Sequence, residues 1–403
     1  MVTVGSVSGL CVLDLSRILA GPLCAQMLGD HGAEVIKIEP PSGDETRLLG
    51  PPFAPGGGAA YYTVANRGKR AIGLDLAHIE GRQVLLRLLA EADVLLENFL
   101  PGTMERWGLG YEAVLAEQFP SLIYCSISGF GVDGPLGGLP GYDAVAQAMA
   151  GLMSINGVPE GEATRVGLPV VDLVTAYNAM VGILLAVSER HRSGRGQRVE
   201  ATLFDSALSL LVPHAANWFC SGKTPGRSGN AHTNIAPYDK FRAGDREVFI
   251  GVVSDAQFRR LCEGLGRPEL AADARFGSNS QRMANRDALR QEIEGTLAPL
   301  DPEKLCTDLM RRGVPAGLVN TLPQALAHPH VAHRAMVVTG PDGSPSGLGV
   351  PVKLSRTPGA AGGPAPAFGE GAESVLAQAG YSVQEVAALR ATGAVLDAPR
   401  GPR

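Results

Sequence analysis

Three observations on the sequence predict an α/β fold built on a parallel sheet. Short apolar runs alternate with amphipathic stretches from residue 10 to residue 128, and strands that alternate with helices form parallel sheets covered on both faces. The chain has 403 residues, which exceeds the size at which single cores stop growing, so two domains are expected. A hydrophobic content of 45% supports a folded core.

Each element of the first third follows from its local pattern. The apolar runs predict strands at 10–16, 34–39, 71–76, 93–99 and 122–127. The stretches between them predict helices at 20–32, 80–92 and 111–119. Ligands of such sheets bind at the carboxyl ends of the strands. Function is therefore expected in the loops 17–21, 40–47, 98–106 and from 129 onward.

The remainder of the chain predicts a long helix and a second domain. Residues 173–191 are apolar nearly all round, which indicates a buried helix. A region from about Gly229 carries elements at 247–253, 256–266 and 301–317, and this mixture is typical of a smaller α+β domain. The Pro/Gly/Ala-rich stretch 358–371 indicates an extended linker, and a last helix is expected at 373–390.

Charge and cysteine usage exclude several classes of protein. The net charge of -5 gives no basic footprint for nucleic acid. No window resembles the ~20-residue apolar span of a membrane helix, and the N-terminus lacks the basic region of a signal peptide. Six scattered cysteines indicate a reducing compartment, and the histidines show no metal-ligand spacing. We expect a soluble, cytoplasmic protein without a metal.

The segment "SLIYCSISGFGVDG" (121–134) contains the glycine spacing of a dinucleotide-binding turn, at Gly129, Gly131 and Gly134. That turn requires a helix directly after its last glycine, because the helix N-terminus holds the pyrophosphate. Here "PLGGLPGYD" follows, and its prolines and glycines oppose a helix start. The pattern therefore does not indicate NAD or FAD.

Carboxylates are the main catalytic candidates, and Asp172 stands out. It follows the apolar approach "RVGLPVV" and lies where the long helix is expected to begin. An aspartate there is most simply a helix N-cap. A carboxylate held ionised by the helix dipole in apolar surroundings could also be a nucleophile. Lys69, Arg70 and Arg106 could hold phosphates, although each taken alone is more simply a surface charge.

The chain resembles the class III CoA-transferases, the CaiB/BaiF family, across nearly its whole length. The segments that carry the resemblance occur in family order: "VLDLSRILAGPLCAQMLGDHGAEVIKIEPPSGDETR", "YYTVANRGKRAIGLDL", "ADVLLENFLPGTMERWGLGYE", "SISGFGVDGP", "GYDAVAQAMAGL", "ERHRSGRGQRVEATLFDSAL", "GVPAGLVNTLPQALAHPHV" and "PVKLSRTPG".

The resemblance implies a fold and an assembly. It implies a Rossmann-like large domain over residues 1–205, to which 335–403 return. A linker at 206–228 and a small α+β domain at 229–334 complete the chain. Two such chains would interlock as rings in a homodimer. Coenzyme A or acyl-CoA would be a substrate, with no permanently bound cofactor.

The resemblance also implies site residues. The catalytic aspartate falls on Asp172, which would attack an acyl-CoA thioester and pass through a mixed anhydride and an aspartyl-CoA thioester. The CoA-contacting segments fall on Arg17 to Ala20, Asn66 to Arg70, Asn98 with Phe99, and Arg106, with the segments that hold Gly129 and Tyr142 in addition.

Two departures bear on the substrate. The formyl-CoA branch has a run of glycines in its small domain, and no such run occurs between 229 and 330, so an oxalate or formate role is not expected. The related α-methylacyl-CoA racemases have a histidine where this chain has Tyr142, and a phenol with a pKa near 10 is a poor base near neutrality. This favours a transferase over a racemase or epimerase, or over a non-catalytic acyl-CoA-binding paralogue.

The acceptor acid is left open. Branches that this chain resembles use short dicarboxylates, such as succinyl-CoA as donor. Polar residues near the domain junction could contact the distal carboxylate, or could join the linker to the domains: His214, Asn217, Asn234, Tyr238 and Arg242.

Overall fold

The computed structural model describes residues 5–53, 58–340 and 345–400, and the chain divides into two compact units. The large unit comprises Met1–Leu152, Val166–Leu210 and Ala332–Arg403, and the small unit comprises Met153–Arg165 and Leu211–Val331. The chain thus leaves the large unit twice and returns to it twice.

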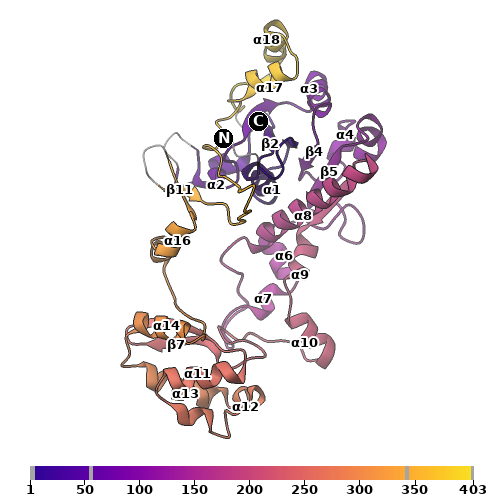
Figure 1. Ribbon diagram of the computed structural model, residues 1–403. Helices are drawn as coiled ribbons and strands as arrows, with labels where there is room; N and C mark the ends of the chain where they lie inside the picture. Colours follow the sequence, from indigo (N-terminus) through magenta and orange to yellow (C-terminus); the bar gives the residue numbers. More distant parts are fainter. Residues whose placement is uncertain (1–4, 54–57, 341–344, 401–403) are drawn as a thin grey trace. The chain divides into compact units, whose positions relative to one another are not determined.

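A seven-stranded sheet forms the centre of the large unit (Figure 1). Its order is β12-β3-β2-β1-β4-β5-β6, and all pairs are parallel except β12 with β3. The direction of the strand order reverses between β1 and β4, which lie side by side. The strands are β1 (Cys11–Asp14), β2 (Glu34–Glu39), β3 (Arg70–Leu74), β4 (Val94–Glu97), β5 (Ile123–Ser128), β6 (Arg198–Thr202) and β12 (Val395–Leu396).

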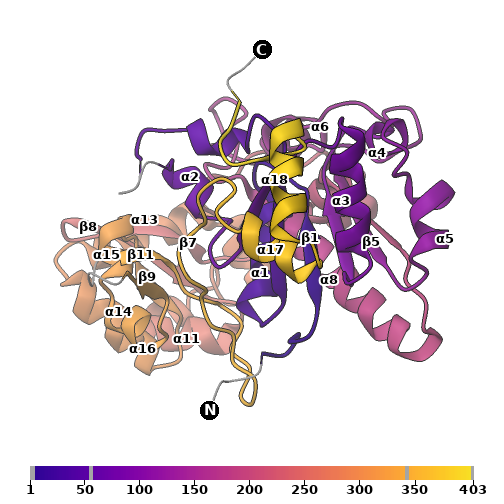
Figure 2. The same ribbon diagram turned by 90° about the horizontal axis from the view of Figure 1, so that it is seen from above.

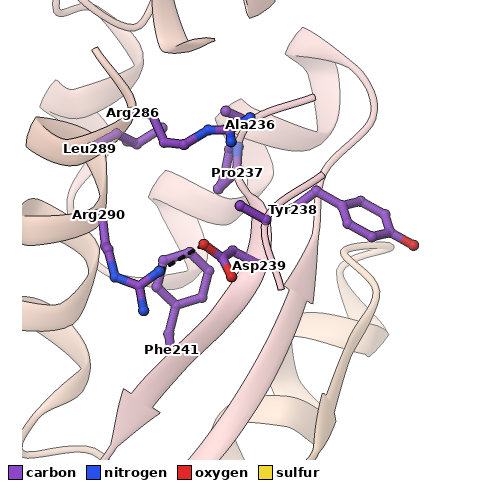
Figure 3. A pocket seen from close by; sticks show the side chains of 9 residues that line it. Ala236, Pro237, Tyr238, Asp239, Phe241, Arg286, Leu289 and Arg290 are labelled. Atoms are coloured by element: carbon purple, nitrogen blue, oxygen red, sulfur yellow. Dashed lines mark hydrogen bonds and ion pairs between the residues drawn. The ribbon is translucent and has the colours of Figure 1, made fainter. Parts of the chain in front are cut away.

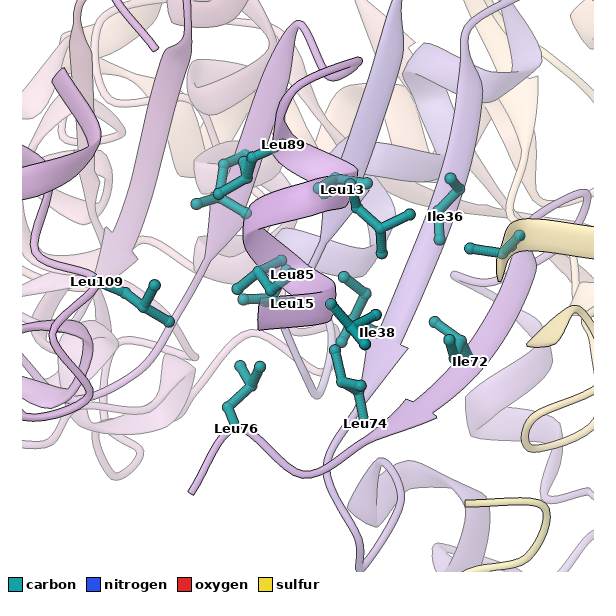
Figure 4. Packing of buried hydrophobic residues seen from close by; sticks show 14 of the residues in the cluster. Leu13, Leu15, Ile36, Ile38, Ile72, Leu74, Leu76, Leu85, Leu89 and Leu109 are labelled. Carbon is teal, nitrogen blue, oxygen red and sulfur yellow. The ribbon is translucent and has the colours of Figure 1, made fainter. Parts of the chain in front are cut away.

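Helices cover both faces of this sheet. Successive side chains of a strand point to opposite faces, so each strand presents apolar residues on both sides that the helices bury. Leu13 and Ile72 face one side, where they pack with α3, α17 and α18 (Figures 2 and 4). Val12 and Ile123 face the other side, where they pack with α1 and α8. Leu13 is fully buried, so Leu13→Ala is expected to cost about 2–5 kcal/mol of stability.

The other elements of the large unit connect these layers. Its helices are α1 (Ala20–Asp30), η1 (Glu45–Leu48), α2 (Ala60–Thr63), α3 (Ile79–Leu89), α4 (Thr103–Arg106), η2 (Tyr111–Leu115), α5 (Ala116–Gln118), α6 (Asp143–Met149), α8 (Val170–Ser193), α9 (Leu203–Ser209), α17 (Ala372–Gln378) and α18 (Val383–Thr392). A separate hairpin pairs β10 (Val337–Thr339) with β11 (Pro345–Leu348), and α7 (Leu152–Ile155) and α16 (Pro329–His333) lie where the chain passes between units.

The small unit has its own sheet and its own core. Three antiparallel strands are ordered β7-β8-β9, and helices pack on them around Val248, Ile250 and Phe258. The elements are α10 (His214–Ser221), β7 (Tyr238–Ala243), β8 (Arg246–Gly251), α11 (Asp255–Gly264), η3 (Pro268–Ala271), α12 (Asn279–Ala284), α13 (Arg286–Leu297), α14 (Pro302–Arg311), β9 (Ala316–Leu318) and α15 (Leu322–Leu326).

The predicted α/β fold with a large parallel sheet is confirmed, and the five predicted strands correspond to β1 to β5. The edge strands β6 and β12 were not predicted. The helix expected at 373–390 is two helices, α17 and α18, separated by Gly380 in a left-handed conformation. No helix follows Gly134 until α6 begins at Asp143, which confirms the rejection of a dinucleotide turn.

The expectation that 173–191 form a buried helix is wrong for one face of that helix. One face of α8 packs on the sheet through Ala176, Ala179 and Ile183, but Val181 and Leu185 are 55% and 67% exposed. By length and composition α8 is the one helix among the described residues that could span a membrane, so the expectation that no window resembles such a span is wrong. Its packing against α1, β5 and β6 accounts for its apolar residues on one face only.

Candidate active site

Asp172 is the third residue of α8 and is only partly accessible to solvent. Burial raises the pKa of its carboxyl group to about 7, and the negative charge of Asp143 acts in the same direction. Desolvation disfavours the charged form of a carboxyl group, and a nearby like charge adds to this effect. Near neutral pH Asp172 is therefore poised between its protonated and ionised forms, which is typical of a functional carboxylate.

Asp143 fixes the backbone from which Asp172 projects. It is buried at the first position of α6, and its Oδ2 accepts hydrogen bonds from the N–H groups of Val171 at 2.7 Å and Asp172 at 3.2 Å. Its Oδ1 accepts a bond of 2.6 Å from Gln147. These N–H groups belong to the first turn of α8, which lacks partners within the helix.

Tyr61 of α2 lies within electrostatic reach of both carboxyl groups. Burial raises the pKa of its phenol, and the negative charges of Asp172 and Asp143 raise it further. Its hydroxyl group therefore stays protonated at neutral pH. Tyr61 and Asp143 were both missed by the sequence analysis, since each lies within a recognised segment but carries no local signal of a role. Only the fold brings residues 61, 143 and 172 together.

Two expectations for Asp172 are wrong: it is not the N-cap of the long helix, and the helix dipole does not hold its carboxylate ionised. Pro169 is the N-cap of α8 and forms no side-chain cap, and the N–H groups of the first turn are held by Asp143 instead. Because Asp143 brings a negative charge to the same helix end, the field there opposes ionisation of Asp172. Burial and this charge outweigh the dipole, and the pKa rises.

Three of the predicted CoA-contacting residues lie on the loops after β1 and β4. The Arg17 guanidinium lies over the Phe99 ring at 5.6 Å from its centroid and pairs with Glu45 at 2.7 Å. Arg106 at the end of α4 is exposed, and within the described residues no carboxylate pairs with it. Since ligands bind at the carboxyl ends of strands where the order reverses, these loops are the expected position for a nucleotide.

Two predicted residues are buried in a polar network instead. Lys69 is 5% exposed, and its ammonium group donates to Asp14 at 2.7 Å, to the carbonyl of Pro22 at 2.8 Å and to Asn66 at 2.9 Å. Asn66 is fully buried and donates to the carbonyl of Tyr62. An ammonium group has three donors, and all three of Lys69 have partners within the protein.

Arg70 points toward the amino end of the sheet. It pairs with Glu34, the first residue of β2, and donates to Gln378 at 2.7 Å. Ala20, in contrast, is the first residue of α1 and belongs to the loop region after β1. The structure thus brings together Arg17, Ala20, Asn98, Phe99 and Arg106 near the carboxyl edge, and it separates Arg70 from them.

Gly129 and Tyr142 lie on either side of the turn that precedes α6. Gly129 packs against the backbone of Gly141, and a Cβ at Gly129 would lie 2.8 Å from the Gly141 Cα atom. This close approach requires glycine. Tyr142 is the residue before α6 and is 67% exposed. The turn therefore places Asp143 through tight backbone packing.

The polar residues considered for the acceptor lie in the small unit. Asn217 and Asn234 hold each other through two amide hydrogen bonds of 2.8 and 3.1 Å. Tyr238 lines a small cavity of this unit (Figure 3). The two arginines that line the cavity are held by the unit itself, Arg290 by Asp239 at 2.7 Å and Arg286 by the carbonyl of His232.

Comparison with known proteins identifies the class to which this fold and site belong. The family model described as CoA-transferase family III matches residues 7–372. The chain is 41% identical to a succinyl-CoA:mesaconate CoA-transferase of Haloarcula hispanica, with 93% of this chain and 97% of the relative covered. It is also 41% identical to an acetyl-CoA:oxalate CoA-transferase of Acetobacter aceti, with 87% and 90% covered.

A solved structure shows the same fold. The CaiB/BaiF family protein from Brucella suis superposes with a TM-score of 0.83 at 41% identity, covering 93% of this chain and 99% of that chain. The chain belongs to CoA-transferase family III, as its resemblance to the CaiB/BaiF proteins predicted. It is a CoA-transferase, and CoA thioesters are the substrates of its family.

Proposed function

We propose that Asp172 is the nucleophile of a ping-pong CoA transfer. Its carboxylate attacks the thioester carbonyl of the donor, the C–S bond breaks, and CoA leaves as the thiolate from a mixed anhydride. The thiolate then attacks the aspartyl carbonyl, which releases the donor acid and leaves an aspartyl-CoA thioester. An acceptor carboxylate enters and the steps run in reverse, so that atoms and charge balance without ATP.

The observation that carries this proposal is the environment of Asp172. Its side chain is partly desolvated, its backbone N–H is held by Asp143, and within the described residues no cation pairs with its carboxylate. A carboxylate without a bound cation keeps its nucleophilic electron pair available. Partial burial also limits access of water, which would hydrolyse the anhydride.

The substrates proposed are short dicarboxylic acids and their CoA thioesters, with succinyl-CoA as the donor. The support comes from the relatives, which name mesaconate or oxalate as acceptor at the same identity of 41%. Both acids are dicarboxylates, so the class is supported more strongly than any one member. Because an oxalate enzyme is among these relatives, the missing glycine run is weak evidence against oxalate.

The nucleotide portion of CoA is proposed to lie on the loops after β1 and β4. Arg17 and Arg106 would supply positive charge for its phosphates, and Phe99 would supply an aromatic surface. Ala20 would contact CoA through its backbone, since α1 has no side-chain cap. Lys69 and Asn66 would support these loops from the interior and would not contact CoA, because their polar groups are already paired within the protein.

The same proposal includes a homodimer and the predicted domains. The large domain comprises 1–205 with 335–403, and a linker at 206–228 joins it to the small domain at 229–334. The homodimer is supported by the exposed apolar side chains of α8, which include Val181 and Leu185, because exposed apolar patches commonly mark interfaces. A cytoplasmic location is supported by the six cysteines, all of which are free thiols.

The test is to trap the covalent intermediate on the purified chain. The chain is incubated with succinyl-CoA and then treated with hydroxylamine, and the modified residue is located by mass spectrometry. Modification at Asp172 is expected, and none in Asp172→Ala. Asp205→Asn is a matched control, because Asp205 is also the third residue of a helix, α9, but is exposed.

The same preparation separates the rival functions. Acetyl-CoA and succinyl-CoA are each offered with mesaconate, glutarate and oxalate as acceptors. Exchange of the α-proton of an acyl-CoA with deuterium, without an acceptor and without modification of Asp172, would show a racemase. Binding of CoA with neither reaction would show an acyl-CoA-binding protein.

A further inference from the structure

The turn between β1 and α1 contains a strained residue at the point where the strand order reverses. Ile18 has a φ of 71° and is, apart from glycines, one of two described residues with positive φ. A β-branched side chain is strongly disfavoured in this left-handed region. Such strain persists only where surrounding contacts enforce it, and it occurs most often at functional sites.

Asn98 supplies the contacts that enforce this conformation. Its Oδ1 accepts a hydrogen bond from the N–H of Arg17 at 2.8 Å, and its Nδ2 donates to the carbonyl of Arg17 at 2.7 Å. The side chain thereby holds both polar groups of the residue directly before Ile18. Asn98 is also the first residue after β4, so one carboxamide joins the two loops that flank the reversal of strand order.

Buried charges anchor the flanks of the same turn. Lys37 donates to the carbonyl of Ser16 at 2.9 Å, and Lys69 donates to the carbonyl of Pro22 at 2.8 Å. The N–H of Ser16 is held by Asp14 at 3.0 Å. The backbone on each side of Arg17 and Ile18 is thus fixed to buried groups, so the strained residues have little freedom to relax while Asn98 is in place.

We infer that Asn98 is a positioning residue for CoA binding: it holds the Arg17–Ile18 turn in its strained form, ready to receive the nucleotide portion of CoA, and it does not itself recognise CoA. This rests on the proposed function. It also separates Asn98 from the residues proposed to contact CoA: Arg106 is exposed, whereas Arg17 pairs with Glu45 and would exchange that partner for a phosphate. Preorganising a loop in its bound form raises affinity because less freedom is lost on binding.

A rescue experiment tests the inference. Dissociation constants for CoA are measured by calorimetry on the full chain and on Asn98→Ala, Ile18→Gly and the double variant. Asn98→Ala is expected to weaken binding about tenfold, which corresponds to about 1.4 kcal/mol, because the turn relaxes. Glycine adopts positive φ without strain. The double variant is therefore expected to recover to within about threefold of Ile18→Gly alone.

Matched controls make each outcome decisive. Ile18→Val keeps the β-branch and should give no recovery when it is combined with Asn98→Ala. If Asn98→Ala does not fold, Asn98→Asp serves in its place, since it keeps the acceptor for the Arg17 N–H and loses the donor. No recovery with Ile18→Gly, or unchanged affinity on removing Asn98, overturns the inference. Absence of CoA binding by the unaltered chain overturns the proposed function as well.

Discussion

Asp14 and Asp172 are two carboxyl groups of the large unit, the first fully and the second partly buried, yet their pKa values move in opposite directions. Asp14, at the end of β1, is fully buried. Its burial alone would raise the pKa, but the ammonium groups of Lys69 and Lys37 outweigh it and the pKa is lowered. Asp172 is less buried and has no cation partner among the described residues, so burial and Asp143 raise its pKa to about 7.

The difference shows how one residue type serves two purposes. Asp14 is ionised at neutral pH and bonded to Ser16 and Lys69, so its charge holds the backbone in place. In the part of the chain that the structure describes, the carboxyl group of Asp172 has no such partner, which makes it costly to ionise but chemically available. A buried charge with a partner is structural, whereas a buried carboxylate without one is a candidate for catalysis.

The largest expected effect tests the catalytic half of this comparison. Asp172→Asn should lower kcat by about 10⁴-fold or more, because an amide cannot form the anhydride. Transfer from succinyl-CoA to the best acceptor of the screen is the measurement. Asp205→Asn should retain activity within about twofold. Substantial turnover by Asp172→Asn would refute the nucleophile assignment.

The structural role of Asp14 in this comparison predicts a loss of stability when its charge is removed. Asp14→Asn leaves the ammonium group of Lys69 buried without its ion-pair partner, whereas Lys37 keeps its buried pair with Asp44. Breaking one partner of a buried ion pair typically costs about 3–5 kcal/mol. The free energy of unfolding should therefore fall by about that amount, as measured by urea denaturation. An unchanged value would mean that the network does not stabilise the fold.

Asp172→Asn should have the opposite effect on stability. The folded state binds a proton up to about pH 7, whereas the unfolded aspartate releases it near its ordinary pKa of 3.9. Stability is therefore lost as the pH rises between these values. At pH 8 the variant should be more stable by roughly 2 kcal/mol, a value reduced for partial exposure. At pH 4 the gain should vanish, and a gain independent of pH would contradict this explanation.

The smallest effect concerns Asp143. Asp143→Asn removes the negative charge that helps to raise the pKa of Asp172, while burial, the larger cause, stays. The acidic limb of kcat/KM, expected near pH 7, should move to lower pH by less than about one unit. The pH dependence of kcat/KM is measured for Asp143→Asn and for the control variant Asp205→Asn. If the acidic limb of Asp143→Asn lies at the same pH as that of the unaltered chain, burial alone sets the pKa of Asp172.

The sequence predicted the strands of the central sheet well, because each is a short apolar run between turn residues. It failed for β6 and β12, whose sequences "RVEAT" and "VL" show no such run. The sequence also did not predict that one face of α8 is exposed, since apolar residues occur all round that helix. Whether Val181 is covered depends on what packs there, and this cannot be deduced from periodicity.

The sequence by itself determined the family, the α/β fold class and Asp172 as the catalytic candidate, because these depend on local pattern and on the order of motifs along the chain. Only the tertiary structure decided what each charged residue does. Lys69 became an internal anchor because the fold surrounds it with acceptors, and Arg106 stayed exposed. Burial and neighbouring charge set the pKa of a side chain, and both arise from residues far apart in the chain.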